Sequence, residues 1–149
     1  MKFLILNGPN LNMVGIREKN IYGTESFQDI IQMIEDHANE TGVSVKCLQS
    51  NHEGDLVDWI QSAWFEQYDG IVMNPGAYTH TSIAIADAVK AIAPIPVIEI
   101  HISDIDSREA FRHVSYAAPY CLCQIKGLGS KGYLKAMDEL IAHCSRSSE

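Results

Sequence analysis

Short apolar segments of strand character alternate along this chain with longer segments whose apolar residues recur at helical spacing. The strand-like segments span residues 3–6, 43–48, 71–73, 97–100 and 122–125. Regular alternation of this kind is the signature of a doubly wound α/β sheet, in which parallel strands are linked by helices. We therefore predict a five-stranded parallel sheet with helices on both faces.

Four segments show the helical period. In the first, Ser26 is a predicted N-cap, an apolar face follows at helical spacing, and Gly42 is placed to end the helix. The other three cover residues 56–64, about 81–92 and about 130–144, and we expect the polar tail from Ser145 to fray. Because neither a linker nor an internal repeat interrupts the pattern, residues 1–149 are interpreted as one domain.

Composition narrows the class of protein. With 149 residues of which 46% are hydrophobic, the chain can bury a full core without disulfides or metals. A net charge of -8 without any dense Lys/Arg run argues against nucleic-acid binding. No apolar run approaches membrane-spanning length, and the N-terminal one is too short for a signal peptide. We expect a cytoplasmic protein that binds neither nucleic acid nor membrane.

The four cysteines fit neither a zinc-binding spacing nor the density of a secreted disulfide scaffold. We interpret them as free thiols and predict no metal site. Cys121 and Cys123 lie two residues apart in a strand-like stretch, so we expect both sulfurs on one face of the sheet.

Clusters of polar residues and glycines follow four of the predicted strands. They begin at Asn7, Ser50, Asn74 and His101. In an open parallel sheet these carboxyl ends lie side by side, and ligands bind in the crevice beyond them. The connection over residues 11–25 is long for a strand-to-helix turn, so we predict that it is a mobile lid that closes over substrate.

Glu99 and His101 are two residues apart in the fourth predicted strand, so their side chains share a face. A carboxylate buried in a strand needs a partner. One interpretation is that Glu99 holds the imidazole in one tautomer and supports its charged form for acid/base catalysis. The alternative is a structural ion pair or a solvent-exposed edge.

Tyr22 lies on the predicted lid, with Arg17 five residues before it. A tyrosine serves as a base near neutral pH only when its pKa, ordinarily roughly 10, is lowered substantially, and a nearby guanidinium lowers it. Tyr22 is therefore a candidate base, although an arginine and a tyrosine in a loop are also common surface residues.

Other strand-end groups suit a small anionic substrate. The neutral polar side chains among them are Asn10, Asn74 and His80, which can hold hydroxyls or a developing enolate. The backbone amides of Ile102 and Ser103 can bind an anion such as a carboxylate. Arg108 and Arg112 either complete the cationic side of this site or lie on a helix surface beside Glu109.

The segment 127–132 fits the dinucleotide pattern G-x-G-x-x-G between a strand and a helix. It occurs in the last strand-helix unit, where no further strand with a ribose-binding acid follows. We interpret it as a glycine-rich turn. A flavin or nucleotide oxidoreductase that uses this turn is a rival hypothesis, as is a flavodoxin-like binding module without catalysis.

Five ordered motifs together resemble the type II 3-dehydroquinate dehydratases of the shikimate pathway, a family of hydro-lyases. The motifs are Leu6-Asn7-Gly8-Pro9-Asn10-Leu11; Arg17-Glu18 with Tyr22-Gly23; Gln49-Ser50-Asn51-His52-Glu53-Gly54; Asn74-Pro75-Gly76-Ala77 with Thr79-His80-Thr81-Ser82; and Glu99-Ile100-His101-Ile102-Ser103 followed by Arg108-Glu109 and Arg112. The resemblance implies a flavodoxin-like fold and trans dehydration of 3-dehydroquinate to 3-dehydroshikimate through an enolate, without metal or organic cofactor.

The resemblance also implies roles for individual residues. Tyr22 resembles the base and Arg17 the residue that keeps it ionised. Asn10 resembles part of the enolate site, and His101, supported by Glu99, resembles the acid. The residues that would bind substrate are Asn74 with the Ile102 and Ser103 amides at the carboxylate, and His80 and Arg112 at the ring hydroxyls.

Asp87 resembles a residue that enters the site of a neighbouring subunit, as expected for the family's dodecamer, a tetramer of trimers. The chain departs from the family pattern at Lys19, where proline is usual, and at Asp104, where asparagine is usual. Aspartate, like asparagine, can cap the element that follows.

Overall fold

The structure is a computed structural model that describes residues 1–16, 20 and 24–149. Within these residues, five parallel strands form one sheet in the order β2-β1-β3-β4-β5. The strands are β1 (Lys2–Asn7), β2 (Ser44–Gln49), β3 (Gly70–Asn74), β4 (Val97–His101) and β5 (Cys123–Lys126). This is the flavodoxin-like order, so the predicted doubly wound sheet is confirmed.

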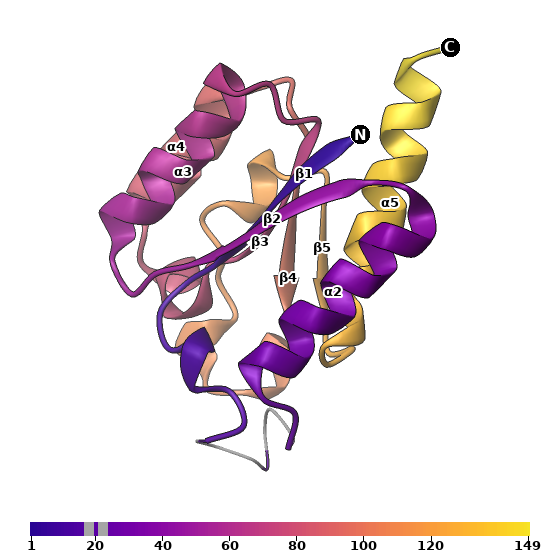
Figure 1. The fold of residues 1–149 in the computed structure, drawn as a ribbon. Helices are drawn as coiled ribbons and strands as arrows, with labels where there is room; N and C mark the ends of the chain where they lie inside the picture. The colour runs from indigo at the N-terminus through magenta and orange to yellow at the C-terminus, as the bar shows by residue number, and fades with distance from the viewer. Residues whose placement is uncertain (17–19, 21–23) are drawn as a thin grey trace.

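Two pairs of helices enclose the sheet. They are α2 (Phe27–Thr41) and α5 (Lys131–Ser147) on one face, and α3 (Glu53–Phe65) and α4 (Ile83–Ala91) on the other (Figure 1). Helix α2 begins at the predicted cap, where Ser26 and Asp29 form a reciprocal capping box, and ends at Gly42 in a left-handed conformation. None of the helices described is long and apolar enough to cross a membrane.

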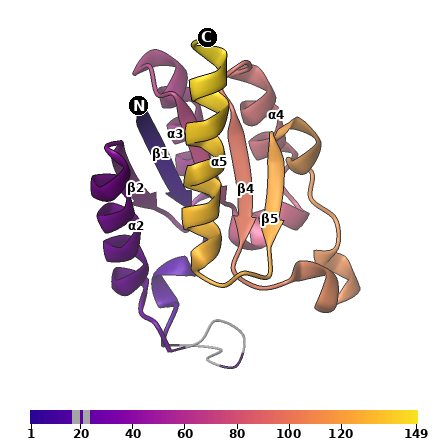
Figure 2. The ribbon, with the colours of Figure 1, turned by 90° about the vertical axis from the view of Figure 1, so that its right-hand side faces the viewer.

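The core has two layers, one on each face of the sheet. Along β1, Phe3 and Ile5 pack toward α2 and α5, whereas Leu4 and Leu6 pack toward α3 and α4. Helix α5 crosses the sheet (Figure 2) and buries Tyr133 and other apolar residues in the first layer. Because β1, β3 and β4 are covered on both faces, nearly every residue in them is buried, as is typical of parallel sheets.

Two local expectations differ from the structure. Helix α5 continues to Ser147 rather than ending near residue 144, and the hydroxyls of Ser147 and Ser148 donate to carbonyl oxygens four residues earlier. Cys123 packs in the layer of α2 and α5 but Cys121 in the layer of α3 and α4, so the prediction of one shared face was wrong. Cys121 precedes β5, and strand alternation therefore does not apply to it.

Short 3-10 helices lie in the connections that follow β1, β3 and β4. They are η1 (Leu11–Met13), η2 (Gly76–His80), η3 (Ile105–Ser107), η4 (Ala110–Arg112) and η5 (Ala118–Tyr120). The segments after β1 and β3 touch directly, since the Gly8 amide donates to the Asn74 carbonyl oxygen at 2.8 Å. A Cβ atom on Gly8 would lie 2.4 Å from the Pro75 carbonyl oxygen, so this approach requires glycine.

Candidate active site

A cleft opens beyond the carboxyl ends of β1, β3 and β4. Its lining consists of Pro9, Asn10, Leu11, Val14, Asn74, Gly76, Ala77, His80, His101, Ile102, Ser103, Ile105, Arg108 and Arg112. The cleft thus brings together the predicted residues Asn10, Asn74, His80, His101, Ile102, Ser103 and Arg112. Its position matches the binding crevice expected of an open α/β sheet.

Two predicted residues that the structure describes are not part of this lining. Glu99 lies on β4 beneath His101, and Asp87 is exposed on α4 away from the cleft. Arg17 and Tyr22 lie outside the described residues, as does Lys19, so their predicted roles and most of the predicted lid stay predictions.

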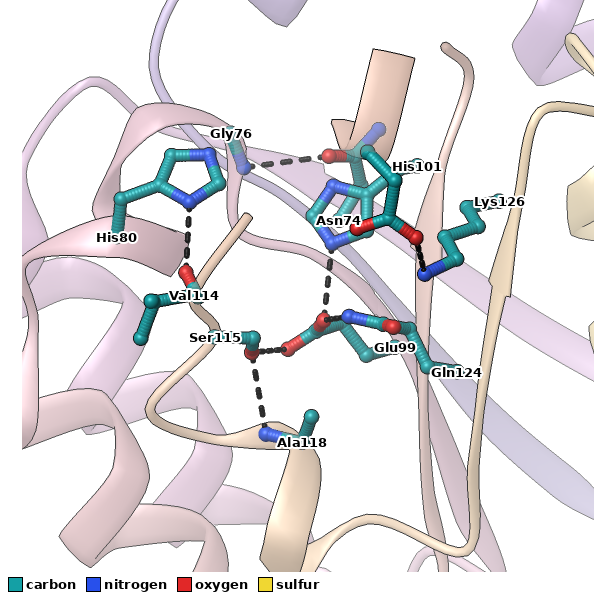
Figure 3. A network of polar contacts seen from close by, with 11 residues as sticks. Asn74, Gly76, His80, Glu99, His101, Val114, Ser115, Ala118, Gln124 and Lys126 are labelled. Carbon is teal, nitrogen blue, oxygen red and sulfur yellow. Dashed lines mark hydrogen bonds and ion pairs between the residues drawn. The ribbon is translucent and has the colours of Figure 1, made fainter. Parts of the chain in front are cut away.

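One wall of the cleft contains a buried histidine-carboxylate pair. Glu99 has no exposed surface, His101 is 5% exposed, and Nε2 of His101 lies 2.9 Å from Oε2 of Glu99 (Figure 3). The β4 strand places both side chains on the sheet face covered by α3 and α4, with Glu99 below and His101 at the strand end.

The Glu99 carboxyl group is held in its ionised form. Burial alone would raise its pKa, but hydrogen bonds and charge attraction from His101, with further hydrogen bonds from Ser115 and Gln124, bring the pKa below its ordinary value. An ionised carboxylate only accepts hydrogen bonds, so the His101 Nε2–H donates to it. Nδ1 is then the ring nitrogen that remains for a substrate in the cleft.

His80 lies beside His101 but has a different partner. The two rings stack with centroids 6.5 Å apart, and Nδ1 of His80 lies 2.8 Å from the Val114 carbonyl oxygen. Partial burial, together with repulsion from His101 and Arg112, lowers the pKa of His80 despite the bond to Val114. His80 is therefore neutral near pH 7, with Nδ1–H donating to the carbonyl and Nε2 as a hydrogen-bond acceptor.

The backbone amides of Ile102 and Ser103 form one edge of the cleft and are the predicted anion-binding groups. Within the described residues, neither of these N–H groups donates a hydrogen bond to the protein. Their carbonyl oxygens, in contrast, are held by the glycine-rich turn: the Gly129 amide donates to Ile102 at 3.0 Å and the Gly127 amide to Ser103 at 3.2 Å. The carbonyl of Ile102 and the N–H of Ser103 belong to one peptide group, so the bond from Gly129 fixes the orientation of the Ser103 amide.

Cations border this edge. Arg108 Nη1 is 3.5 Å from the Ser103 hydroxyl oxygen, and Arg112 pairs through Nε with the carboxylate of Glu109. Asp104 caps η3 by accepting from the Asp106 amide at 3.1 Å, as expected for an aspartate at this position. An anionic substrate group at the two amides would thus lie next to two guanidinium groups that also line the cleft.

Asn10 and Asn74 approach the cleft from β1 and β3. Asn10 has a left-handed backbone, φ 68°, which asparagine tolerates better than most residues, and its amide donates to Asn51 Oδ1 at 3.0 Å. The Asn74 carboxamide accepts from the Gly76 amide at 3.2 Å and donates to the Tyr133 hydroxyl at 3.1 Å. Its orientation is therefore fixed, and its second N–H donates to none of the residues that the structure describes.

Sequence reasoning missed three residues that support the site. Tyr133 of α5 donates to Asn7 and accepts from Asn74, while Ser115 and Gln124 donate to Glu99. The sequence did point to Gln124, because a polar residue inside a predicted strand needs a polar partner. It did not point to Ser115 or Tyr133, since serines are common in loops and tyrosines are common on apolar helix faces.

The described part of the chain holds no group of three or more His, Cys, Asp or Glu side chains arranged to bind a metal ion. The polar groups that converge on the cleft are imidazoles, carboxamides, guanidinium groups and backbone amides. Such a set binds anions and hydroxyls and transfers protons.

Comparisons with known proteins identify the family. Residues 1–141 match the family "Dehydroquinase class II". The chain is 52% identical to a 3-dehydroquinate dehydratase of Clostridium perfringens, over 96% of this chain and 97% of that protein. It is 55% identical to one of Caldicellulosiruptor bescii, over 91% and 93%.

A solved structure agrees with the sequence relatives. The type II dehydroquinase from Butyrivibrio crossotus superimposes with a TM-score of 0.94 at 52% identity, covering 95% of this chain and 97% of the other. Agreement in family profile, in sequence over nearly the whole length and in fold leaves one assignment. The chain belongs to the class II dehydroquinase family.

Proposed function

We propose that this hydro-lyase removes water from 3-dehydroquinate to give 3-dehydroshikimate, by trans elimination through an enolate, with Tyr22 as base and His101 as acid. The observation that carries the proposal is the Glu99-backed imidazole of His101 at a cleft that also presents two backbone amides. Within the described residues these amides make no hydrogen bond to the protein. The relatives that bear the name 3-dehydroquinate dehydratase support the same substrate.

In the proposed reaction the substrate carboxylate binds the Ile102 and Ser103 amides, with the remaining Asn74 N–H beside them. The Tyr22 phenolate, kept ionised by Arg17, removes a proton next to the ketone. Asn10 stabilises the enolate that forms. The enolate then expels the hydroxyl group, which takes a proton from the His101 imidazolium and leaves as water.

Two further groups orient the ring in this proposal. Nε2 of neutral His80 accepts a hydrogen bond from one ring hydroxyl, while Arg112 donates to another. Glu99 keeps its charge throughout and holds the imidazole. The reaction involves no change of oxidation state, and each proton is moved by a side chain, so the proposal includes neither metal nor cofactor.

The decisive test is an ultraviolet assay on protein treated with a metal chelator and then dialysed. We expect 3-dehydroquinate to yield an enone with rising absorbance. Tyr22→Phe should reduce kcat by about 10³-fold or more, and Arg17→Ala should move the working range of the base to higher pH. Binding of 3-dehydroquinate without any enone would instead identify a binding module and refute the proposal.

The same proposal includes assembly into a dodecamer, a tetramer of trimers, in the cytoplasm. Ile83 and Asp87 lie one helical turn apart on the outer face of α4, where Ile83 is 61% exposed. Burial of such a face in a trimer would carry Asp87 to a neighbouring site. Sedimentation velocity of the wild-type protein should show a species of twelve chains, and a monomer would contradict this part.

A further inference from the structure

The carboxylate of Glu99 accepts two hydrogen bonds besides the one from His101. The Ser115 hydroxyl donates to Oε1 at 2.6 Å, and the Gln124 amide nitrogen donates to Oε2 at 2.5 Å. Figure 3 shows the three donors converging on the two oxygens from different directions. Each carboxylate oxygen is therefore fixed, and rotation of the group would break at least one bond.

The two added donors come from separate parts of the fold. Gln124 is the direct neighbour of Glu99 across the β4-β5 ladder, so the register of the sheet sets its position. Ser115 lies before η5, and its hydroxyl oxygen accepts from the Ala118 amide at 3.1 Å while its proton goes to Glu99. Ser115 is thereby oriented by the same turn that it caps.

The residue before Ser115 is tied to the second histidine. The Val114 carbonyl accepts from His80, so adjacent residues of one short segment hold His80 directly and His101 through Glu99. This segment sets the spacing between two rings that stack across the cleft wall. Displacement of Ser115 would therefore change the positions of both imidazoles.

The titratable groups that face Glu99 are His101 on its own strand, His80 on η2 and Cys121 next to η5. Burial, followed by repulsion from Glu99, raises the pKa of Cys121 to about 12, so this thiol stays neutral. His80 is neutral as well. The Glu99 carboxylate is thus stabilised by hydrogen bonds from His101, Ser115 and Gln124.

We infer that Ser115 and Gln124 are positioning residues for the acid: they hold the Glu99 carboxylate ionised, with Oε2 directed at His101 Nε2, so that Nδ1 carries the transferable proton. This inference rests on the proposed function, because it assigns a purpose to the orientation of His101. Neither residue lines the cleft, so each acts through Glu99 rather than on substrate.

The test uses Gln124→Met and Ser115→Ala in the full-length protein, with Ser115→Thr as the variant that keeps a hydroxyl. Gln32→Met on α2 and Ser62→Ala on α3 are matched controls away from the cleft. Because a hydrogen bond to a charged group is lost, we expect each test variant to lower kcat about tenfold with little change in KM. Ser115→Thr and both controls should stay near wild type.

A second readout does not depend on turnover. At the alkaline end of a pH series, where the ring signals of His101 no longer change with pH, ¹⁵N spectra of the wild-type protein should show His101 as the Nε2–H tautomer. Gln124→Met and Ser115→Ala should add the Nδ1–H tautomer. A substitution that only loosened the fold would lower the melting temperature without this spectroscopic change.

The outcomes separate the two proposals. A tautomer mixture in the variants supports the positioning role even if the wild-type protein makes no enone, in which case the proposed function alone fails. Folded Gln124→Met protein with wild-type kcat and an unchanged His101 spectrum overturns the inference. If Ser115→Ala does not fold because the turn at Ala118 is lost, Gln124→Met decides the question by itself.

Discussion

His101 and His80 are the same residue type a few ångströms apart in one cleft, yet their surroundings give them opposite properties. His101 is backed by a buried carboxylate, whereas His80 is backed by a neutral backbone carbonyl and repelled by neighbouring cations. An imidazole beside a carboxylate is suited to carry and release a proton, and one beside a carbonyl is suited to accept a hydrogen bond. The partner group therefore sets the role of each ring.

The secondary-structure elements that carry the two rings also differ, in how deeply they are buried and how rigidly they hold the side chain. His101 ends a buried strand and is 5% exposed, while His80 ends a 3-10 helix and is half-buried. A proton donor must be fixed precisely relative to the bond it breaks, which a central strand provides. A residue that only contacts a hydroxyl group tolerates a looser element.

The largest expected effect comes from removal of the proposed acid. His101→Ala should lower kcat by about 10³-fold, since general acid catalysis is lost, while the fold stays intact. His37→Ala is the matched control, because Nε2 of His37 pairs with Asp138 at 2.7 Å in a second histidine-carboxylate contact away from the cleft. Nearly normal turnover in His101→Ala would show that His101 is not the proton donor and that it does not differ from His80 in this way.

A smaller effect is expected for His80→Ala, about tenfold and mainly in KM, because one hydrogen bond to substrate is lost without loss of proton transfer. His143→Ala on α5, also half-buried, is the control. Steady-state kinetics at several pH values measure both constants. If His80→Ala lowered kcat as much as His101→Ala, the two imidazoles would share the acid role.

The smallest expected effect is on stability. The pKa of Glu99 in the folded protein lies below its ordinary value of 4.5, so its ionised form stabilises the fold above that pH, and this contribution is lost as the pH falls through the folded-state pKa. The gap in unfolding free energy between wild type and Glu99→Gln should be largest near pH 7 and shrink in acid.

Urea unfolding at a series of pH values measures this gap. Glu139→Gln, at an exposed position on α5, is the control and should show little difference from wild type at any pH. If the difference in unfolding free energy between wild type and Glu99→Gln did not change between neutral and acidic pH, the carboxylate charge would not stabilise the fold.

The fold was predictable because its signals are local. Apolar periodicity located all four described helices and all five strands, and Ser26 and Gly42 marked the ends of α2 as predicted. Two differences arose at the ends of elements. The end of α5 was underestimated, and the face of Cys121 depended on a turn that breaks the strand period.

The site was predictable to the extent that its residues follow strand ends. Glu99 and His101 could be paired from their spacing, and the topology then brought Asn10, Asn74 and His80 to the same edge. The partners of these residues were not predictable, because cross-strand register and loop path decide them. Gln124 meets Glu99 only through the β4-β5 register, and nothing local links Ser115 to it.

The glycine-rich turn after β5 resembles a nucleotide-binding loop in sequence, but here its amides hold the backbone carbonyls of Ile102 and Ser103. The Gly129 amide holds the carbonyl of the peptide group whose N–H belongs to Ser103, and this bond polarises that N–H toward an incoming anion. Gly129 has φ 62°, which an alanine would adopt only with strain. A substitution that rigidified this turn to stabilise the protein would therefore also alter the Ser103 amide, from a position outside the lining of the cleft.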